Sequence, residues 1–232
     1  MNQASVFDEC AATYDEALDR GLSLSGEPKE FFARRRVEWL AARLREHGYR
    51  PRVALDYGCG TGGTTQMLLE TFRAASATGV DVSVESIRRA RTACANSRVR
   101  FDTIEEWNPA GGYDVAYCNG VFHHIEPDDR PAALAAIGRA LSPGGYFAFW
   151  ENNPWNPGTR LVMRRIPFDR DAKTLSAPRA RRLLEAAGFD VVTTDFLFLF
   201  PRAFALLRPI ESALTCIPAG AQYMVLCRKR RS

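Results

Sequence analysis

The amino-acid sequence predicts an α/β fold, doubly wound around a mostly parallel, seven-stranded sheet whose last strand is antiparallel. From residue 52 onward, short apolar runs alternate with segments of helical periodicity, as in sheets whose parallel strands are joined by crossover helices. The first apolar run leads through a glycine-rich turn at 58–63 directly into a helix. Two long apolar runs near the end of the chain, at 191–200 and 222–227, can form the antiparallel pair that completes such a sheet.

Two helices are expected before the first strand. The first is amphipathic, because its apolar residues recur at helical spacing: Phe7, Ala11, Tyr14 and Leu18. The second begins near Pro28 and ends at Gly48. Its buried stripe is expected to consist of Ala33, Val37, Leu40 and Leu44. These helices form an N-terminal cover, which either closes over a ligand site or only shields one face of the sheet.

Strands and helices then alternate in regular order. The first five strands are expected at 52–56, 77–82, 99–101, 113–118 and 146–150. The helices between them are expected at 62–73, after an N-cap at Ser83, and from 128–131 to a stop at 142–145. The next residues, 151–175, are rich in Asn, Pro and Arg and predict an ordered insertion. A further helix is expected from Ser176 to Gly188.

Length and charge favour a single domain without nucleic acid as a partner. The 232 residues fit a single domain with additions, divided into a helical cover (1–49), a nucleotide-binding core (50–151) and an insertion with the last strands (152–232). The net charge of +4 is modest, and the basic residues are spread over several helices and the C-terminal tail. Nucleic acid is therefore not an expected partner, and we expect a monomer or a homodimer.

Cysteine spacing and hydropathy indicate a cytoplasmic protein. The six cysteines form no C-x-x-C pair, which speaks against a zinc site or a disulfide framework, and no metal is expected. The first residues lack the basic start and the apolar core of a signal peptide. No segment approaches the ~18 apolar residues of a membrane-spanning helix.

The glycine turn fits two kinds of nucleotide ligand. Gly58, Gly60 and Gly63 match the dinucleotide fingerprint G-x-G-x-x-G, and Asp81 lies about 20 residues further on, where that fingerprint expects an acid for a ribose hydroxyl. This pattern is typical of nucleotide-dependent oxidoreductases of the Rossmann type.

The same turn also fits an alternate-glycine pattern, D-x-G-x-G-x-G, in which Gly62 is the third glycine and Asp56 precedes the turn. A carboxylate at the mouth of the turn would repel a pyrophosphate bound at the helix N-terminus. It can instead accept hydrogen bonds, directly or through water, from the ammonium of an amino acid. Asp56 therefore favours a nucleoside that carries an amino-acid moiety.

Five segments, in order, resemble the motifs of class I S-adenosylmethionine-dependent methyltransferases of the small-molecule type (methyltransferase type 11/12-like). The segments are 55–62 (LDYGCGTG), 79–83 (GVDVS), 102–105 (DTIE), 119–125 (NGVFHHI) and 141–146 (LSPGGY). The third lacks the Gly-Asp dipeptide that is usual in the family. The resemblance covers residues 52–151 and implies a Rossmann-like fold, S-adenosyl-L-methionine as cofactor and S-adenosyl-L-homocysteine as product.

The resemblance also implies which residues contact the cofactor. Asp81 would bridge the two ribose hydroxyls, Val82 would pack on the adenine, and the turn after the third strand would meet the adenine edge. Tyr14 of the cover would reach the methionine end, although a tyrosine in an amphipathic stripe can equally be core. The full set of implied cofactor residues is Tyr14, Asp56, Gly58, Cys59, Gly60, Gly62, Asp81, Val82, Thr103, Ile104, Asn119 and Gly120.

Two histidines are candidates for a general base. Methyl transfer mainly requires an acceptor atom held in line with the departing sulfur, but an acceptor that carries a proton also benefits from a base. His123 and His124 follow the fourth strand, where the reacting centre is expected. Neighbours on an extended segment point to opposite sides, so at most one is expected to act, and a packing role for both stays open.

Acceptor contacts are expected after the fifth strand. The segment 150–157 offers amides, a carboxylate and two indoles, and it lies beside the edge where open α/β sheets bind ligands. The candidates are Glu151, Asn152, Asn153 and Trp155, and the alternative is an Asn-Pro turn that only shapes the insertion. The apolar residues between Phe196 and Leu206 are expected to lie mostly in the sheet core, with some lining an acceptor pocket or a dimer face.

The sequence thus predicts methyl transfer to an oxygen or nitrogen of a small, partly apolar molecule. Two alternatives remain at this point. One is a nucleotide-dependent oxidoreductase, supported by the dinucleotide fingerprint. The other is a protein that binds S-adenosylmethionine without methylating an acceptor.

Overall fold

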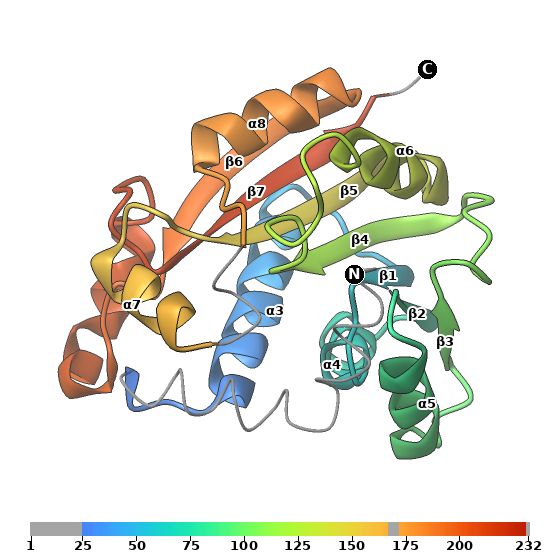
Figure 1. Ribbon diagram of the computed structural model, residues 1–232, viewed down its shortest axis with the longest axis horizontal. Helices are drawn as coiled ribbons and strands as arrows, with labels where there is room; N and C mark the ends of the chain where they lie inside the picture. Colours follow the sequence, from blue (N-terminus) through green and yellow to red (C-terminus); the bar gives the residue numbers. More distant parts are fainter. Residues whose placement is uncertain (1–24, 167–171, 231–232) are drawn as a thin grey trace.

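The strand order of the sheet is β3-β2-β1-β4-β5-β7-β6 (Figure 1). The computed structural model describes residues 25–166 and 172–230. Its strands are β1 (Val53–Tyr57), β2 (Ser76–Asp81), β3 (Val99–Thr103), β4 (Tyr113–Asn119), β5 (Leu141–Asn152), β6 (Phe189–Leu197) and β7 (Gln222–Lys229). The first five strands pair in parallel, and β7 lies antiparallel between β5 and β6. The predicted mixed, seven-stranded sheet is confirmed.

Helices cover both faces of this sheet. They are α3 (Lys29–Glu46), α4 (Gly63–Phe72), α5 (Val84–Ala93), α6 (Arg130–Ala140), α7 (Pro157–Arg165), α8 (Ala177–Ala186) and the 3-10 segment η3 (Arg202–Ala213). Helices α3, α4 and α5 lie along one side of the sheet, and α6 and α8 along the other (Figure 1). Two apolar clusters correspond to these layers, one joining α3 and α4 to the sheet and one joining α6 and α8 to its opposite face.

Side-chain hydrogen bonds cap the starts of α5 and α7. The Ser83 hydroxyl accepts a hydrogen bond from the backbone N–H of Ser86 at 3.0 Å, as predicted for an N-cap. Asn156 caps α7 in the same way, accepting from the N–H of Thr159 at 2.9 Å. Across the described residues, no helix combines the length and the apolar character needed to cross a membrane.

The fifth strand starts earlier than the sequence indicates. It was expected from Tyr146, but pairing with β4 already begins at Leu141, and the register shifts between Tyr113 and Val115. The backbone is tightly packed there, since a Cβ at Gly145 would lie 3.0 Å from the carbonyl oxygen of Asp114. The Pro-Gly-Gly turn is thus absorbed into an irregular strand start.

Helix α3 buries a stripe that differs from the expected one. Val37, Leu40 and Leu44 are buried as predicted, but Ala33 is only half-buried. Arg36 is buried beside this stripe, although the helical pattern alone gives no reason for it. The first helix of the predicted cover, including Tyr14, lies outside the described residues.

The apolar end of the chain divides into three environments. Phe196 and Leu197 belong to the sheet core, as expected. Residues 198–201 leave the sheet and line a cavity described below. Phe204 and Leu206 of η3 are exposed and do not join the core.

The parallel strands bring the predicted site residues to one edge. Tyr57 at the end of β1 is paired with Val80 of β2 and with Cys118 of β4. Asn119 at the end of β4 is paired with Trp150 of β5. In open α/β sheets, ligands bind beyond this carboxyl edge, near the point where the strand order reverses.

Candidate active site

The glycine turn after β1 is held tightly against its neighbours. The N–H groups of Gly58 and Cys59 both donate to the Val80 carbonyl, at 2.7 and 3.0 Å. Gly58 has a φ of 79°, and a Cβ there would lie 2.2 Å from Cγ2 of Val121. Only glycine combines this left-handed backbone with such a close approach. The turn therefore packs directly against the segment that follows β4.

Asp81 ties the turn to the end of β2. Its carboxylate accepts hydrogen bonds from the backbone N–H of Gly60 at 2.8 Å and of Ser83 at 2.9 Å. Above Gly60 the space is open, since a Cβ built there would meet no heavy atom within 4 Å. A carboxylate beside an open glycine cradle fits the nucleoside of S-adenosylmethionine.

The sequence suggested that Asp56 lies at the mouth of the turn. In the structure it lies beneath the turn instead. Its side chain is 2% exposed and accepts a hydrogen bond from the Thr65 hydroxyl at 2.7 Å. The reason is that Asp56 faces α4 from the interior of β1. Burial raises the pKa of this carboxyl to about 7. A contact with the cofactor's ammonium stays a prediction.

The residues expected near the adenine flank Asp81. Ile104 donates its backbone N–H to the Asp81 carbonyl at 2.9 Å, and Thr103 is paired with Asp81 across the two strands. Val82 is exposed beside them. Cys59, in contrast, is buried behind the turn, and burial raises the pKa of its thiol well above the ordinary value.

The end of β4 and the segment after it contain a buried hydrogen-bond acceptor without a donor among the described residues. Gly120 donates its N–H to the Trp150 carbonyl at 3.0 Å, which fixes the segment to β5. Asn119 Oδ1 is buried and has no hydrogen-bond partner among the described residues. Buried polar atoms nearly always have a partner. Asn119 therefore fits a bound group that donates hydrogen bonds, as the cofactor's amino-acid end does.

His123 forms a buried pair with Glu151. Nδ1 of His123 lies 2.6 Å from Oε2 of Glu151, and the two residues are 3% and 1% exposed. The backbone N–H of His123 also donates to Oε1 of Glu151 at 3.2 Å. Glu151 thus orients the imidazole of His123, a role that its position in the sequence did not reveal.

The two histidines do not point to opposite sides. The segment forms a turn, closed by a hydrogen bond from the N–H of His124 to the Val121 carbonyl at 2.9 Å. As a result the two imidazole rings lie 4.1 Å apart, centroid to centroid, and both line the cavity. The expectation from an extended segment was wrong because the chain bends here.

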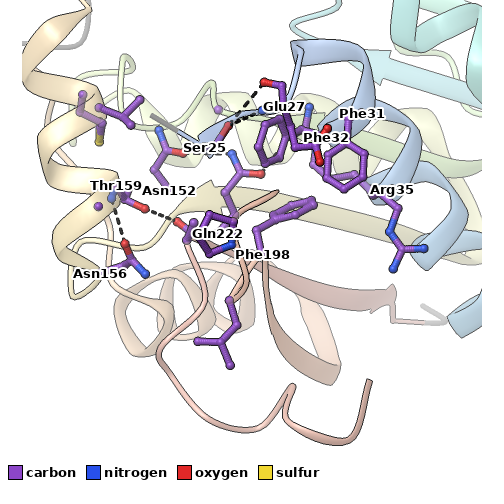
Figure 2. A pocket seen from close by; sticks show the side chains of 18 of the residues that line it. Ser25, Glu27, Phe31, Phe32, Arg35, Asn152, Asn156, Thr159, Phe198 and Gln222 are labelled. Carbon is purple, nitrogen blue, oxygen red and sulfur yellow. Dashed lines mark hydrogen bonds between the residues drawn. The ribbon is translucent and has the colours of Figure 1, made fainter. Parts of the chain in front are cut away.

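A cavity of about 440 Å³ opens beyond β4 and β5, next to the histidines (Figure 2). Its apolar wall combines Phe31 and Phe32 of α3 with α7 residues and with Phe198, which follows β6. The ring of Phe32 meets the rings of Phe31 and Phe198 edge to face, at centroid distances of 5.4 and 5.0 Å. Polar groups on the lining include Asn119, His123, His124, Asn152, Asn156 and Gln222.

Only one of the four predicted acceptor residues lines this cavity, namely Asn152. Glu151 is buried behind it with His123. Asn153 is fully buried, and its amide donates to the carbonyls of Pro218 and Gly220 at 3.0 and 2.8 Å. Trp155 is 52% exposed and does not line the cavity. The segment therefore mainly shapes the site, as the Asn-Pro alternative proposed.

Several lining residues were not foreseen from the sequence. Phe31, Phe32 and Arg36 belong to α3, whose pattern indicated only a cover. Gln222 begins β7 and was expected as a strand residue. The adjacent phenylalanines of α3 were the available signal, because the helix carries more apolar surface than its buried stripe needs.

Comparisons with known proteins identify the family of the chain. Residues 30–194 match the sequence model of a family described as "Methyltransferase domain". The trans-aconitate 2-methyltransferase of Rhodopseudomonas palustris (strain BisB18) is 31% identical over 137 residues, which make up 59% of this chain and 50% of that protein. The chain thus spans about half the length of this relative.

Solved structures share the fold. A Mesorhizobium loti S-adenosylmethionine-dependent methyltransferase matches with a TM-score of 0.60 and 20% identity, over 83% of this chain and 98% of that chain. A Burkholderia thailandensis 1,6-didemethyltoxoflavin-N1-methyltransferase, solved with S-adenosylhomocysteine, matches with a TM-score of 0.57 and 27% identity, over 85% of this chain and 78% of that chain.

These findings decide against the nucleotide-dependent oxidoreductase. The family match begins inside α3, includes the glycine turn, and ends within β6, so it spans more than half of the chain. The chain belongs to the class I S-adenosylmethionine-dependent methyltransferases, enzymes whose methyl donor is S-adenosyl-L-methionine.

Proposed function

We propose that this enzyme methylates an oxygen or a nitrogen of a small, partly apolar molecule held in the cavity next to His123 and His124. The observation that carries the proposal is the composition of that cavity. It joins the segment after β4, where the methyl group is expected, to an aromatic wall built by Phe31, Phe32 and Phe198.

The size and lining of the cavity suit a small acceptor. A volume of about 440 Å³ lies within the range of small-molecule sites. The relatives support the same class of substrate, since their names describe methylation of trans-aconitate and of 1,6-didemethyltoxoflavin.

The residues of the site would have separate roles in binding the cofactor and the acceptor. When bound, S-adenosyl-L-methionine supplies a methyl group activated by positively charged sulfur. Gly58, Gly60 and Asp81 would hold the nucleoside, and Asn119 would accept a hydrogen bond from the amino-acid end. Asn152 and the aromatic wall would hold the acceptor in line with the methyl group.

His123 is the better placed of the two base candidates. If Glu151 is ionised, it accepts the Nδ1 proton of His123, which leaves Nε2 of the neutral ring unprotonated. Nε2 can then take the proton that an acceptor hydroxyl or amine loses as its bond to the methyl carbon forms. His124 lies beside it, with the two ring centroids 4.1 Å apart.

The proposal is tested by following a labelled methyl group. Purified protein is incubated with methyl-labelled S-adenosyl-L-methionine and a panel of small phenols, amines and carboxylates, and label in the acceptor is counted. We expect His123→Gln to lower kcat by about 100-fold or more, while the Kd for S-adenosylhomocysteine changes less than twofold. The matched control is His47→Gln, because His47 is exposed at the end of α3.

Two results would contradict parts of this proposal. Tight binding of S-adenosylhomocysteine without transfer to any acceptor would favour the alternative of a non-methylating cofactor-binding protein. Full turnover in His123→Gln with loss in His124→Gln would move the base to His124.

A further inference from the structure

Arg36 is a buried cation that lines the acceptor cavity. It lies on α3, it is 8% exposed, and its guanidinium has two hydrogen-bond partners among the described residues. Nε donates to the Tyr117 hydroxyl at 3.0 Å, and Nη1 donates to Oε1 of Gln222 at 2.9 Å. Both partners are neutral groups. Within residues 25–166 and 172–230, no carboxylate forms an ion pair with Arg36.

The neighbouring acidic and phenolic groups do not supply the missing charge. Burial raises the pKa of Tyr117 to about 12, so its hydroxyl stays neutral. Asp56 is not a hydrogen-bond partner of Arg36, and burial favours the neutral form of its carboxyl by raising the pKa to about 7. Isolated buried charges are unfavourable, and buried cations are normally paired.

Other arginines of the described structure are satisfied in ordinary ways. Arg208, which also lines the cavity, lies 2.9 Å from a carboxylate oxygen of Glu27. Arg130 is equally buried, and it donates to the carbonyls of Ile125 and Lys173 at 3.0 and 2.7 Å. Arg36 differs from Arg208 because it has no carboxylate partner among the described residues, and it differs from Arg130 because it lines the cavity.

The guanidinium is also held in place. Gln222 accepts from Arg36 and donates through Nε2 to Oδ1 of Asn152 at 3.0 Å, so its amide orientation is fixed from both sides. Arg36, Gln222 and Asn152 thus form a continuous row on the cavity lining. A guanidinium fixed in this way keeps Nη2 and the second hydrogen of Nη1 as donors for a carboxylate.

We propose that Arg36, oriented by Tyr117 and Gln222, is a carboxylate-binding subsite of this cavity. The inference rests on the proposed function, in which the cavity holds the acceptor and adjoins the methionine end of the cofactor. The carboxylate belongs either to the acceptor or to the amino-acid end of S-adenosylmethionine. In both cases it supplies the negative charge that the buried guanidinium lacks.

Calorimetry on three variants tests the subsite. Arg36→Met removes the charge at similar length, and Arg36→Lys keeps the charge without the planar fork. Arg34→Met is the matched control, because Arg34 is exposed on the same helix and is not part of the cavity lining. The ligands are S-adenosylhomocysteine, the carboxylate-free nucleoside 5′-methylthioadenosine, and two carboxylate probes, trans-aconitate and benzoate.

We expect Arg36→Met to lose tenfold or more in affinity for a carboxylate ligand, while the Kd of methylthioadenosine changes less than twofold. If Arg36→Met loses affinity for S-adenosylhomocysteine, the subsite binds the carboxylate of the cofactor. If Arg36→Met loses affinity for a carboxylate probe while its affinity for S-adenosylhomocysteine is unchanged, the subsite binds the carboxylate of the acceptor. The affinity of Arg36→Lys for this ligand is expected to lie between those of the wild type and Arg36→Met. The affinity of Arg34→Met is expected to match that of the wild type.

The proposal is overturned if Arg36→Met binds S-adenosylhomocysteine as the wild type does and no probe binds in an Arg36-dependent manner. An equal loss for methylthioadenosine also overturns it, because the effect would then be structural. If Arg36→Met does not fold, Arg36→Lys decides the question by the same comparison of ligands. These experiments measure binding and not methyl transfer. If a carboxylate ligand binds in an Arg36-dependent manner but no methyl group is transferred, only the proposed function is contradicted.

Discussion

The proposed cofactor side and the proposed acceptor side of the active site are built by different means. The cofactor side, comprising residues 56–62, 81–82 and 103–104, rests on backbone conformation and on short contacts between adjacent strands. The acceptor side comprises the first half of α3 and residues 152–166, 198–201 and 221–222, and it is built from side chains of segments far apart in the sequence.

This difference explains what each side leaves in the sequence. A turn that needs a left-handed backbone requires glycine at fixed spacing, so the cofactor side appears as a motif. Edge-to-face rings need only large aromatic groups that meet in space, so the acceptor side leaves no local pattern. Phe198 illustrates this, because it packs on Phe32 from a left-handed backbone with a φ of 63° that nothing in its sequence context predicts.

The largest expected effect comes from the tightest point of the cofactor side. Gly58→Ala would place a Cβ 2.2 Å from Cγ2 of Val121, and we expect affinity for S-adenosylhomocysteine to fall by about 100-fold or more, with a lower Tm. Gly48→Ala is the matched control, because Gly48 has a φ of 66° and open space around it. It should cost about 1–2 kcal/mol of stability and leave binding unchanged, as measured by calorimetry and thermal unfolding. Equal binding by both variants would contradict a backbone-built cofactor side.

Asp81→Asn should have the next largest effect. The carboxylate accepts two backbone N–H groups, and hydrogen bonds to charged groups contribute about 1.5–3 kcal/mol. We expect about a 10- to 100-fold loss in affinity for S-adenosylhomocysteine, with a smaller change in stability. Asp190→Asn serves as control, because Asp190 is exposed on β6 and pairs with Arg230. Unchanged affinity in Asp81→Asn would remove the ribose assignment.

Phe32→Ala probes the acceptor side alone. Its ring contacts those of Phe31 and Phe198, and aromatic pairs contribute about 0.5–1.5 kcal/mol beyond buried area. We expect the KM for a labelled acceptor to rise about tenfold while the Kd for S-adenosylhomocysteine stays within twofold. Phe204→Ala, an exposed aromatic of η3, should change neither value. A parallel loss of cofactor affinity in Phe32→Ala would show that the two sides are not separable.

Asp56→Asn should have the smallest effect of the four substitutions, and this effect is on stability. Burial raises the pKa of Asp56 in the folded protein above the ordinary value, to about 7. Its bound proton therefore stabilises the folded state fully below about pH 4, and this stability is lost as the pH rises through 7. Between pH 6 and pH 8 the wild type should therefore lose about 1 kcal/mol relative to Asp56→Asn. Urea unfolding of the ligand-free protein at both pH values measures this, with the exposed Asp128→Asn as control. A pH-independent difference would mean that Asp56 is ionised throughout.

The sequence was most informative where one local signal determines the structure. Alternating strands and helices, the Ser83 cap and the glycine turn at 58–63 were all recognisable, because each depends on residues a few positions apart. Glu151 and His123 are 28 residues apart, and Arg36 lies 81 and 186 residues from its partners Tyr117 and Gln222. Such pairs depend on tertiary packing, which single-sequence periodicity does not encode.

The position of β7 also sets the order in which the two sides can be completed during protein synthesis. Strand β6 pairs with β7 and with no other strand of the described sheet. A ribosome finishes β1 to β5 well before β7, so β6 must wait for residues 222–229 to emerge before it can join the sheet. Gln222, the partner of Arg36, arrives at the same moment. The nucleoside cradle can therefore form on a growing chain at a stage when the acceptor cavity still lacks one of its walls.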